Sequence, residues 1–81
     1  MASYEEMLKE TTDILSKHVD LNRTITAKDH IQHDLGLDSL GVMEVVADIE
    51  DRFDVQIPQE TLSSISTVDD MVKALQKLPK S

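Results

Sequence analysis

Apolar residues recur at helical spacing in separate stretches of the chain. In the first stretch they fall three or four positions apart from Met7 to Val19, with charged residues between them. Such a repeat places the apolar side chains on one face of an α-helix. Ser3 and Glu6 have the spacing of a helix-capping box. The pattern predicts a helix that starts at Ser3 and ends near Val19 or Asp20.

A second helix is predicted over about Ser39–Phe53, where the apolar residues form two stripes. The first stripe has the spacing of a core-facing side and comprises Val42, Val45, Val46, Ile49 and Phe53. The second lies on a neighbouring face and comprises Leu40, Met43 and Ala47. Burial of the helix on two sides would explain the second stripe, and so would isolated exposed apolar residues without a function. A surface that docks a partner is the third explanation.

Two further helices are predicted towards the C-terminus. Pro58 keeps the preceding residue extended and can open a short helix over Gln59–Ser63. A last helix is expected after Ser66 or Thr67, because Thr67 and Asp70 again have the spacing of a capping box. Its buried stripe comprises Val68, Met71, Val72, Leu75 and Leu78.

The segment 20–38 has no long helical repeat, so a long loop is predicted between the first two main helices. A loop of this length is unusual in a compact domain unless it is anchored or functional. Its apolar residues could anchor it to the helices, and they are Leu21, Ile25, Ile31, Leu35 and Leu37. The sequence thus predicts one all-α domain over 1–81, a four-helix bundle of three main helices and one short helix, with an ordered loop.

The composition narrows the chemistry that this chain can perform. Only Tyr4 and Phe53 are aromatic, so the core must be aliphatic with some methionine. No cysteine is present, which excludes disulfides and thiolate metal sites, so any thioester chemistry needs a thiol from a cofactor. No His is placed as a convincing base for a nucleophilic serine, and no acidic cluster follows a calcium-loop pattern. We therefore expect neither catalytic residues nor a metal site.

The net charge of −8 is concentrated in one part of the sequence. Between Asp34 and Glu60 there are eight acidic residues and one basic residue, which accounts for −7. This argues against nucleic acid and anionic membranes as partners, because both require a cationic face. Partners that meet this region should present Lys and Arg. No transmembrane stretch or signal peptide is visible, so a cytoplasmic protein is expected, although an organelle protein without its targeting peptide would look the same.

Asp38 and Ser39 mark the start of the second helix. Asp38 can cap the helix with its carboxylate, and Ser39 then takes the first helical position with its hydroxyl outward. A phosphate ester on that hydroxyl would lie near unpaired N–H groups and the positive end of the helix dipole. On spacing alone, an ordinary capping role for these two residues is the favoured interpretation.

The run Leu35-Gly36-Leu37-Asp38-Ser39-Leu40 resembles the attachment motif L-G-x-D-S-L of acyl carrier proteins. The likeness continues through Glu44, the helix end Glu50-Asp51-Arg52-Phe53, Val55-Gln56-Ile57-Pro58 and Ile65-Ser66-Thr67-Val68, and so covers nearly the whole chain. The resemblance implies that a phosphopantetheinyl transferase moves 4′-phosphopantetheine from coenzyme A to Ser39. The arm then holds acyl groups as thioesters.

The resemblance also implies roles for residues around Ser39. Asp38 is its acidic neighbour, the apolar partner contacts are Leu40, Met43, Ala47 and Ile57, and the acidic rim is Glu44, Glu50 and Asp51. The partners are acyltransferases, ketosynthases and other acyl-processing enzymes with basic docking patches. One departure is Gly41, where many fatty-acid carriers have an acidic residue.

The sequence is therefore interpreted as a monomeric, non-catalytic acyl carrier of fatty-acid or polyketide-type biosynthesis. A peptidyl or alanyl carrier is the nearest alternative within the class. An unmodified acidic interaction domain with the same fold is the alternative outside it, and it would accept no phosphopantetheine.

Overall fold

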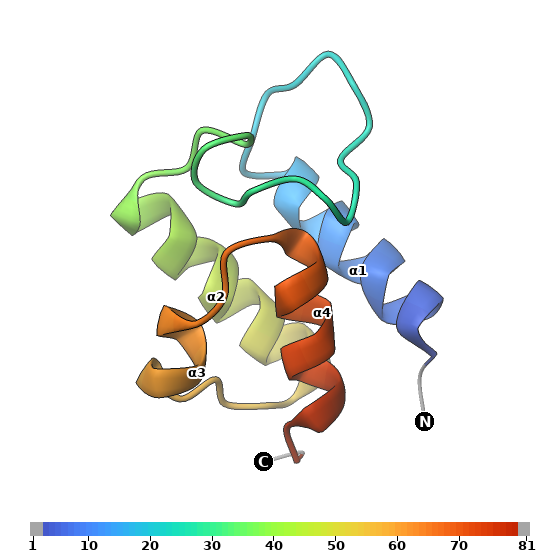
Figure 1. Cartoon of the computed structure of the whole chain (residues 1–81), viewed down its shortest axis with the longest axis vertical. Helices are drawn as coiled ribbons and strands as arrows, with labels where there is room; N and C mark the ends of the chain where they lie inside the picture. The colour runs from blue at the N-terminus through green and yellow to red at the C-terminus, as the bar shows by residue number, and fades with distance from the viewer. Residues whose placement is uncertain (1–2, 80–81) are drawn as a thin grey trace.

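The computed structural model describes residues 3–79, which form four α-helices. They are α1 (Tyr4–Ser16), α2 (Ser39–Phe53), α3 (Gln59–Ser63) and α4 (Val68–Lys77). The longer helices α1, α2 and α4 surround a common centre, the short α3 lies alongside α2, and the loop between α1 and α2 covers one end (Figure 1). The predicted all-α bundle, with three main helices, one short helix and a long loop, is confirmed.

The structure corrects the predicted end of the first helix. α1 ends at Ser16 and not near Val19 or Asp20. Beyond it, the N–H groups of Lys17 and His18 donate to carbonyls three residues back, at 3.1 and 2.9 Å, so the last turn tightens and the helix stops. The apolar spacing continues past this point because Val19 still packs, half-buried, against the core.

The two predicted capping boxes differ in how completely they form. At α1, Ser3 Oγ accepts from the Glu6 N–H at 3.2 Å, while the Glu6 carboxylate accepts from the Ser3 hydroxyl at 3.3 Å. At α4, Thr67 Oγ1 accepts from the Asp70 N–H, and the Asp70 carboxylate accepts from the Thr67 N–H, both at 3.1 Å. The complete box fixes the N-terminus of α4.

The core is aliphatic, as the composition predicts, and α1 packs against both α4 and α2. Its buried side chains come from the helices, the loop and the α2–α3 connector, and they are Met7, Ile14, Leu15, Ile25, Ile31, Leu35, Leu37, Val45, Val46, Ile49, Val55, Ile57, Val68, Met71, Val72 and Leu75. The loop anchors predicted from the sequence are among them, apart from Leu21, which is half-buried. Burial of these anchors explains why so long a loop is ordered.

Thr11 is a polar exception in this core. Its side chain is fully buried, and its hydroxyl has no hydrogen-bond partner within the described residues. An unpaired buried hydroxyl is destabilising, and valine has the same branched shape. We expect Thr11→Val to raise the free energy of unfolding by about 1 kcal/mol, measured by urea denaturation. Thr12→Val removes a hydroxyl that donates to the Lys9 carbonyl at 2.9 Å and should give no gain; equal effects would contradict the prediction.

A polar cluster fixes the fold of the loop. Asp29 is buried, and its carboxylate accepts from both terminal nitrogens of Arg23, at 2.7 and 2.8 Å, and from the Thr26 N–H at 2.7 Å. These bonds, the Arg23 pair first, lower the pKa of Asp29 from 3.8 to about 2. The ionised form is therefore the one that the folded loop binds.

This pairing makes part of the stability pH-dependent. Because the pKa of folded Asp29 lies below its ordinary value, the stabilisation is complete above about pH 4 and is lost as the pH falls towards 2. We expect Asp29→Asn to cost roughly 1–2 kcal/mol at pH 7, discounted because Arg23 is partly exposed. In urea titrations the difference from wild type should shrink at low pH. Asp20→Asn, on the exposed start of the loop, should show neither effect.

The loop is also tied to the start of α4. The N–H of Ile31 donates to the Ser66 carbonyl at 2.9 Å, and the Val68 N–H donates to the Asp29 carbonyl at 3.0 Å. A further bond runs from the Asp69 N–H to the Ala27 carbonyl at 2.9 Å. The loop thus spans the bundle as a strap between α1 and α4 before it enters α2.

Candidate functional site

The start of α2 presents Ser39 to solvent. Gly36 has a φ of 74°, which turns the loop into the helix. Asp38 is the N-cap, and its Oδ1 accepts from the Gly41 N–H at 2.8 Å. Ser39 is exposed at the first helical position, and within residues 3–79 its hydroxyl forms no hydrogen bond. The hydroxyl is therefore free for covalent modification at the positive end of the helix dipole.

Gly41 has a steric explanation in this cap. A Cβ at this position would lie 3.0 Å from Leu37 Cδ2 and 3.2 Å from Asp38 Oδ1. The missing side chain lets Leu37 and the Asp38 carboxylate close over the first turn. An acidic residue at position 41 would therefore crowd the cap as well as add a charge beside Ser39.

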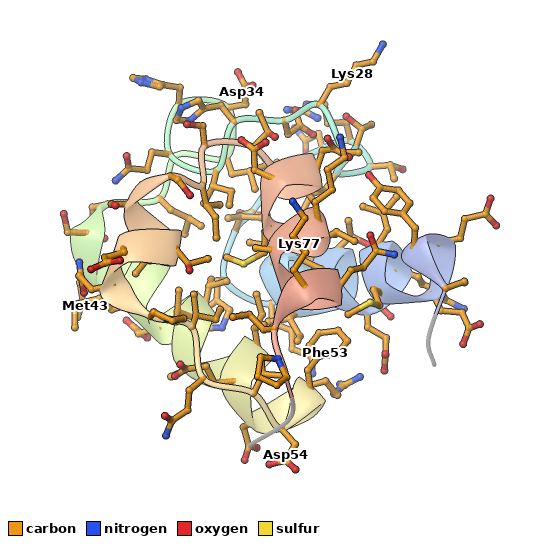
Figure 2. All side chains as sticks on the ribbon, turned by 60° about the horizontal axis from the view of Figure 1, so that its bottom comes forward. Lys28, Asp34, Met43, Phe53, Asp54 and Lys77 are labelled. Carbon is orange, nitrogen blue, oxygen red and sulfur yellow. The ribbon has the colours of Figure 1, made fainter. Side chains whose placement is uncertain are left out.

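The second apolar stripe of α2 lies on the surface. Leu40 and Met43 are each 65% exposed, and they are the large hydrophobic side chains that the described residues expose most. Ala47, one turn further on, is also exposed. Figure 2 shows Met43 pointing outward from α2, away from the core. This exposure excludes burial of the helix on two sides as the explanation of the stripe. A docking surface and isolated exposed apolar residues remain as its explanations.

The acidic residues predicted around this stripe are not equivalent. Glu44 and Asp51 are exposed, as a docking rim requires. Glu50 differs from the prediction because it is half-buried, and its Oε2 accepts from the Ile57 N–H at 2.7 Å. The Glu50 carboxylate therefore already accepts a hydrogen bond within the chain, which distinguishes it from the exposed carboxylates of Glu44 and Asp51.

Ile57 also differs from its predicted place. Its side chain is 8% exposed and belongs to the core. It lies in the connector between α2 and α3, where its backbone N–H is held by Glu50. A side chain buried in this way belongs to the core and offers a partner little exposed surface. The sequence could not separate these roles because an apolar residue before proline fits both.

Two long-range side-chain contacts that the sequence did not reveal join α2 to α1 and to the turn that follows it. His18 Nε2 lies 2.6 Å from Asp48 Oδ2, and an Arg52 nitrogen lies 3.1 Å from a Glu10 oxygen. Both connect residues far apart in sequence, so no local spacing reveals them. They hold α2 against the first part of the chain. Among the described residues, Asp38 and Glu44 form no ion pair with lysine or arginine.

Other kinds of site have less support in residues 3–79. No three His, Asp or Glu side chains gather there as a metal site would require. His30 and His33 approach with ring centroids 4.4 Å apart, but His30 Nδ1 accepts backbone N–H groups from its own turn. No helix in this range is both long and apolar enough to cross a bilayer.

Comparisons with known proteins agree with this geometry. The family model described as "Phosphopantetheine attachment site" matches residues 6–75. The chain is 36% identical over 75 residues to an acyl carrier protein of Prochlorococcus marinus, covering 91% of this chain and 94% of the relative. It is 34% identical over 76 residues to a protein of Caulobacter vibrioides named "Probable acyl carrier protein", covering 94% and 84% of the two chains.

A solved structure shows the same fold. A Mycobacterium tuberculosis protein assigned as an acyl carrier protein superposes with a TM-score of 0.80 and 28% identity, covering 86% of this chain and 95% of that one. The family match spans most of the described helices and includes Asp38 and Ser39. The chain therefore belongs to the acyl carrier protein family, whose members are non-catalytic and carry covalently attached phosphopantetheine.

Proposed function

We propose that Ser39 is the phosphopantetheine attachment site and that the chain carries acyl intermediates of fatty-acid or polyketide-type biosynthesis. The observation that supports this most is the position of Ser39. It is exposed on the first turn of α2, next to the Asp38 cap and the exposed Leu40 and Met43. A serine with only a capping role would not need an apolar surface beside it.

The residues around Ser39 would serve the attached group in separate ways. The Asp38 carboxylate accepts a hydrogen bond from the Gly41 N–H and thereby fixes the first turn, which carries Ser39. The remaining N–H groups of that turn face the position of a phosphate ester. When bound, the phosphopantetheine arm supplies the thiol that this cysteine-free chain lacks. The chain itself tethers the acyl group and raises its local concentration at each partner.

The docking surface that we propose combines an apolar centre with an acidic rim. The centre is Leu40, Met43 and Ala47, and the rim is Glu44 and Asp51, all exposed on α2. Acidic residues would steer partners with basic patches into fast encounters, and an apolar centre of only three side chains would keep the complexes transient. The transferase and the acyl-processing enzymes would share this surface.

Attachment is tested by intact-protein mass after incubation with coenzyme A and a broad-specificity phosphopantetheinyl transferase. The mass should rise by one phosphopantetheinyl group. No gain in folded, unmodified protein with two different transferases would overturn the proposal and favour the unmodified interaction domain. Loading the modified protein with acyl and aminoacyl groups by their respective enzymes then separates an acyl carrier from a peptidyl or alanyl carrier. The Asp before Ser39 and the acidic α2 favour the acyl carrier.

The apolar centre can be tested with the same enzyme. Replacing both Leu40 and Met43 by serine should raise the transferase KM about tenfold, because two exposed anchors leave the interface. Modification should still reach completion at high enzyme concentration, since Ser39 is intact. Gln76→Ser, an exposed position on α4, should leave KM unchanged. Equal KM values for the double variant and the wild type would show that partners do not contact this stripe.

A further inference from the structure

Glu50 is the point where the connector between α2 and α3 is attached to the bundle. Its carbonyl accepts the N–H of Asp54, the residue that ends α2 with a left-handed φ of 54°. The same carbonyl accepts the N–H of Val55 at 3.2 Å. Its side-chain Oε2 accepts the N–H of Ile57 at 2.7 Å. One residue thus holds three backbone N–H groups of the connector.

The last of these bonds depends on the side chain. The carbonyl bonds are ordinary for a helix end and would form with any residue at position 50. The Ile57 bond requires an acceptor at the tip of a side chain as long as glutamate. A charged acceptor makes it stronger than a neutral hydrogen bond. The bond also lies where Val55 and Ile57 are buried, at 6% and 8% exposure, so it fixes the register in which the connector closes the core.

The connector leads directly into α3, which lies alongside α2 in both views (Figures 1 and 2). α3 has no fully buried residue and no side-chain hydrogen bond at its N-cap, Pro58. Little within α3 itself therefore fixes its place. Its position depends on the connector that precedes it and on partly buried contacts such as Leu62.

We infer that Glu50 is a positioning residue: through its bond to the Ile57 N–H it fixes the connector, and with it the position of α3 beside the partner-facing side of α2. Its contribution to partner recognition comes from this hydrogen bond and not from its negative charge. The charges that steer partners belong to the exposed Glu44 and Asp51. The part of this inference that concerns partners rests on the proposed function; the part that concerns the connector does not.

Three substitutions of Glu50 separate the bond from the charge. Glu50→Gln removes the charge but keeps an acceptor of the same reach. Glu50→Asp keeps the charge but is too short to reach the Ile57 N–H. Glu50→Ala removes both. Asp51→Ala removes an exposed neighbouring charge and is the matched control.

The first measurement is hydrogen exchange of the Ile57 amide in the unmodified protein. We expect exchange to accelerate about tenfold or more in the Asp and Ala variants, because the amide loses a hydrogen bond to a charged acceptor. It should stay within about threefold of wild type in the Gln variant. The Ile49 amide, in the middle of α2, reports general loosening and should change less than the Ile57 amide. If Glu50→Ala is too unstable to fold, Glu50→Asp also lacks the bond to the Ile57 N–H and can be compared with the wild type in its place.

The second measurement is the transferase KM at low and at high salt. Salt screens exposed charges over a distance of about 10 Å at 0.1 M, so the Asp51→Ala effect should disappear at high salt. The effect of Glu50→Asp should persist, and Glu50→Gln should behave like wild type. The inference is overturned if Glu50→Gln and Glu50→Ala raise the transferase KM equally while Glu50→Asp does not. It is also overturned if the exchange rate of the Ile57 amide is the same in all three variants. A wild type that accepts no phosphopantetheine would overturn the proposed function and leave the exchange result standing.

Discussion

Ser39→Ala is expected to abolish the mass gain of one phosphopantetheinyl group and to leave the fold intact. The substitution removes the exposed hydroxyl that would bond to the phosphate, and no neighbouring hydroxyl can replace it because Leu40 and Asp38 flank it. The fold should tolerate the change, since the cap bond comes from Asp38 and alanine is a good helix former. The intact mass tests the loss of modification, and helical circular dichroism on the same sample tests whether the fold is retained.

The matched control is another exposed serine at a helix end. Ser63 closes α3, and its hydroxyl donates to the Glu60 carbonyl at 2.8 Å. Ser63→Ala should accept one phosphopantetheinyl group at the wild-type rate. Modification that persists in Ser39→Ala and is lost in Ser63→Ala would move the attachment site away from α2.

Ile49→Ala is expected to remove a large part of the stability of the domain. Ile49 is fully buried on α2, and truncating a buried isoleucine to alanine costs about 2–5 kcal/mol, including the cavity that is left. Small domains have a total stability of about 5–15 kcal/mol. The urea midpoint, followed by circular dichroism, should therefore fall steeply.

Leu40→Ala is the control for this prediction because it makes a similar truncation on the same helix. Leu40 is 65% exposed, so its loss should cost less than about 1 kcal/mol. Similar midpoints for Ile49→Ala and Leu40→Ala would mean that α2 does not pack on the core through Ile49.

The local parts of the fold could be predicted from the sequence. Helical apolar spacing predicts α2 and α4 because most of the side chains that repeat in the sequence are buried in the structure. Val42, Phe53 and Leu78 are half-buried. The Asp38 cap and the Thr67–Asp70 box depend on residues three positions apart or fewer, so local spacing reveals them. The anchors of the loop could be predicted because apolar residues in a polar segment must find the core.

The remaining features depend on contacts that local spacing does not determine. The bond between the Glu50 carboxylate and the Ile57 N–H forms only because the connector after α2 brings these residues together. The bond engages Glu50 within the chain, and Ile57 lies in the core, so neither is the exposed residue that the sequence predicts. The pairing of Arg23 with Asp29 similarly requires the loop to close on itself. The end of α1 was missed because a tight turn preserves the apolar spacing of a helix.

The bonds between the loop and the start of α4 affect the order in which this protein can fold. Ile31 and Asp29 find their backbone partners at Ser66 and Val68, far along the chain. A nascent chain that has emerged from the ribosome only as far as α3 therefore lacks the acceptors and donors that secure the loop leading to Ser39. The segment before Ser39 can therefore reach its final conformation only after the beginning of α4 has left the ribosome, and a transferase that requires the ordered loop would act only from that point on.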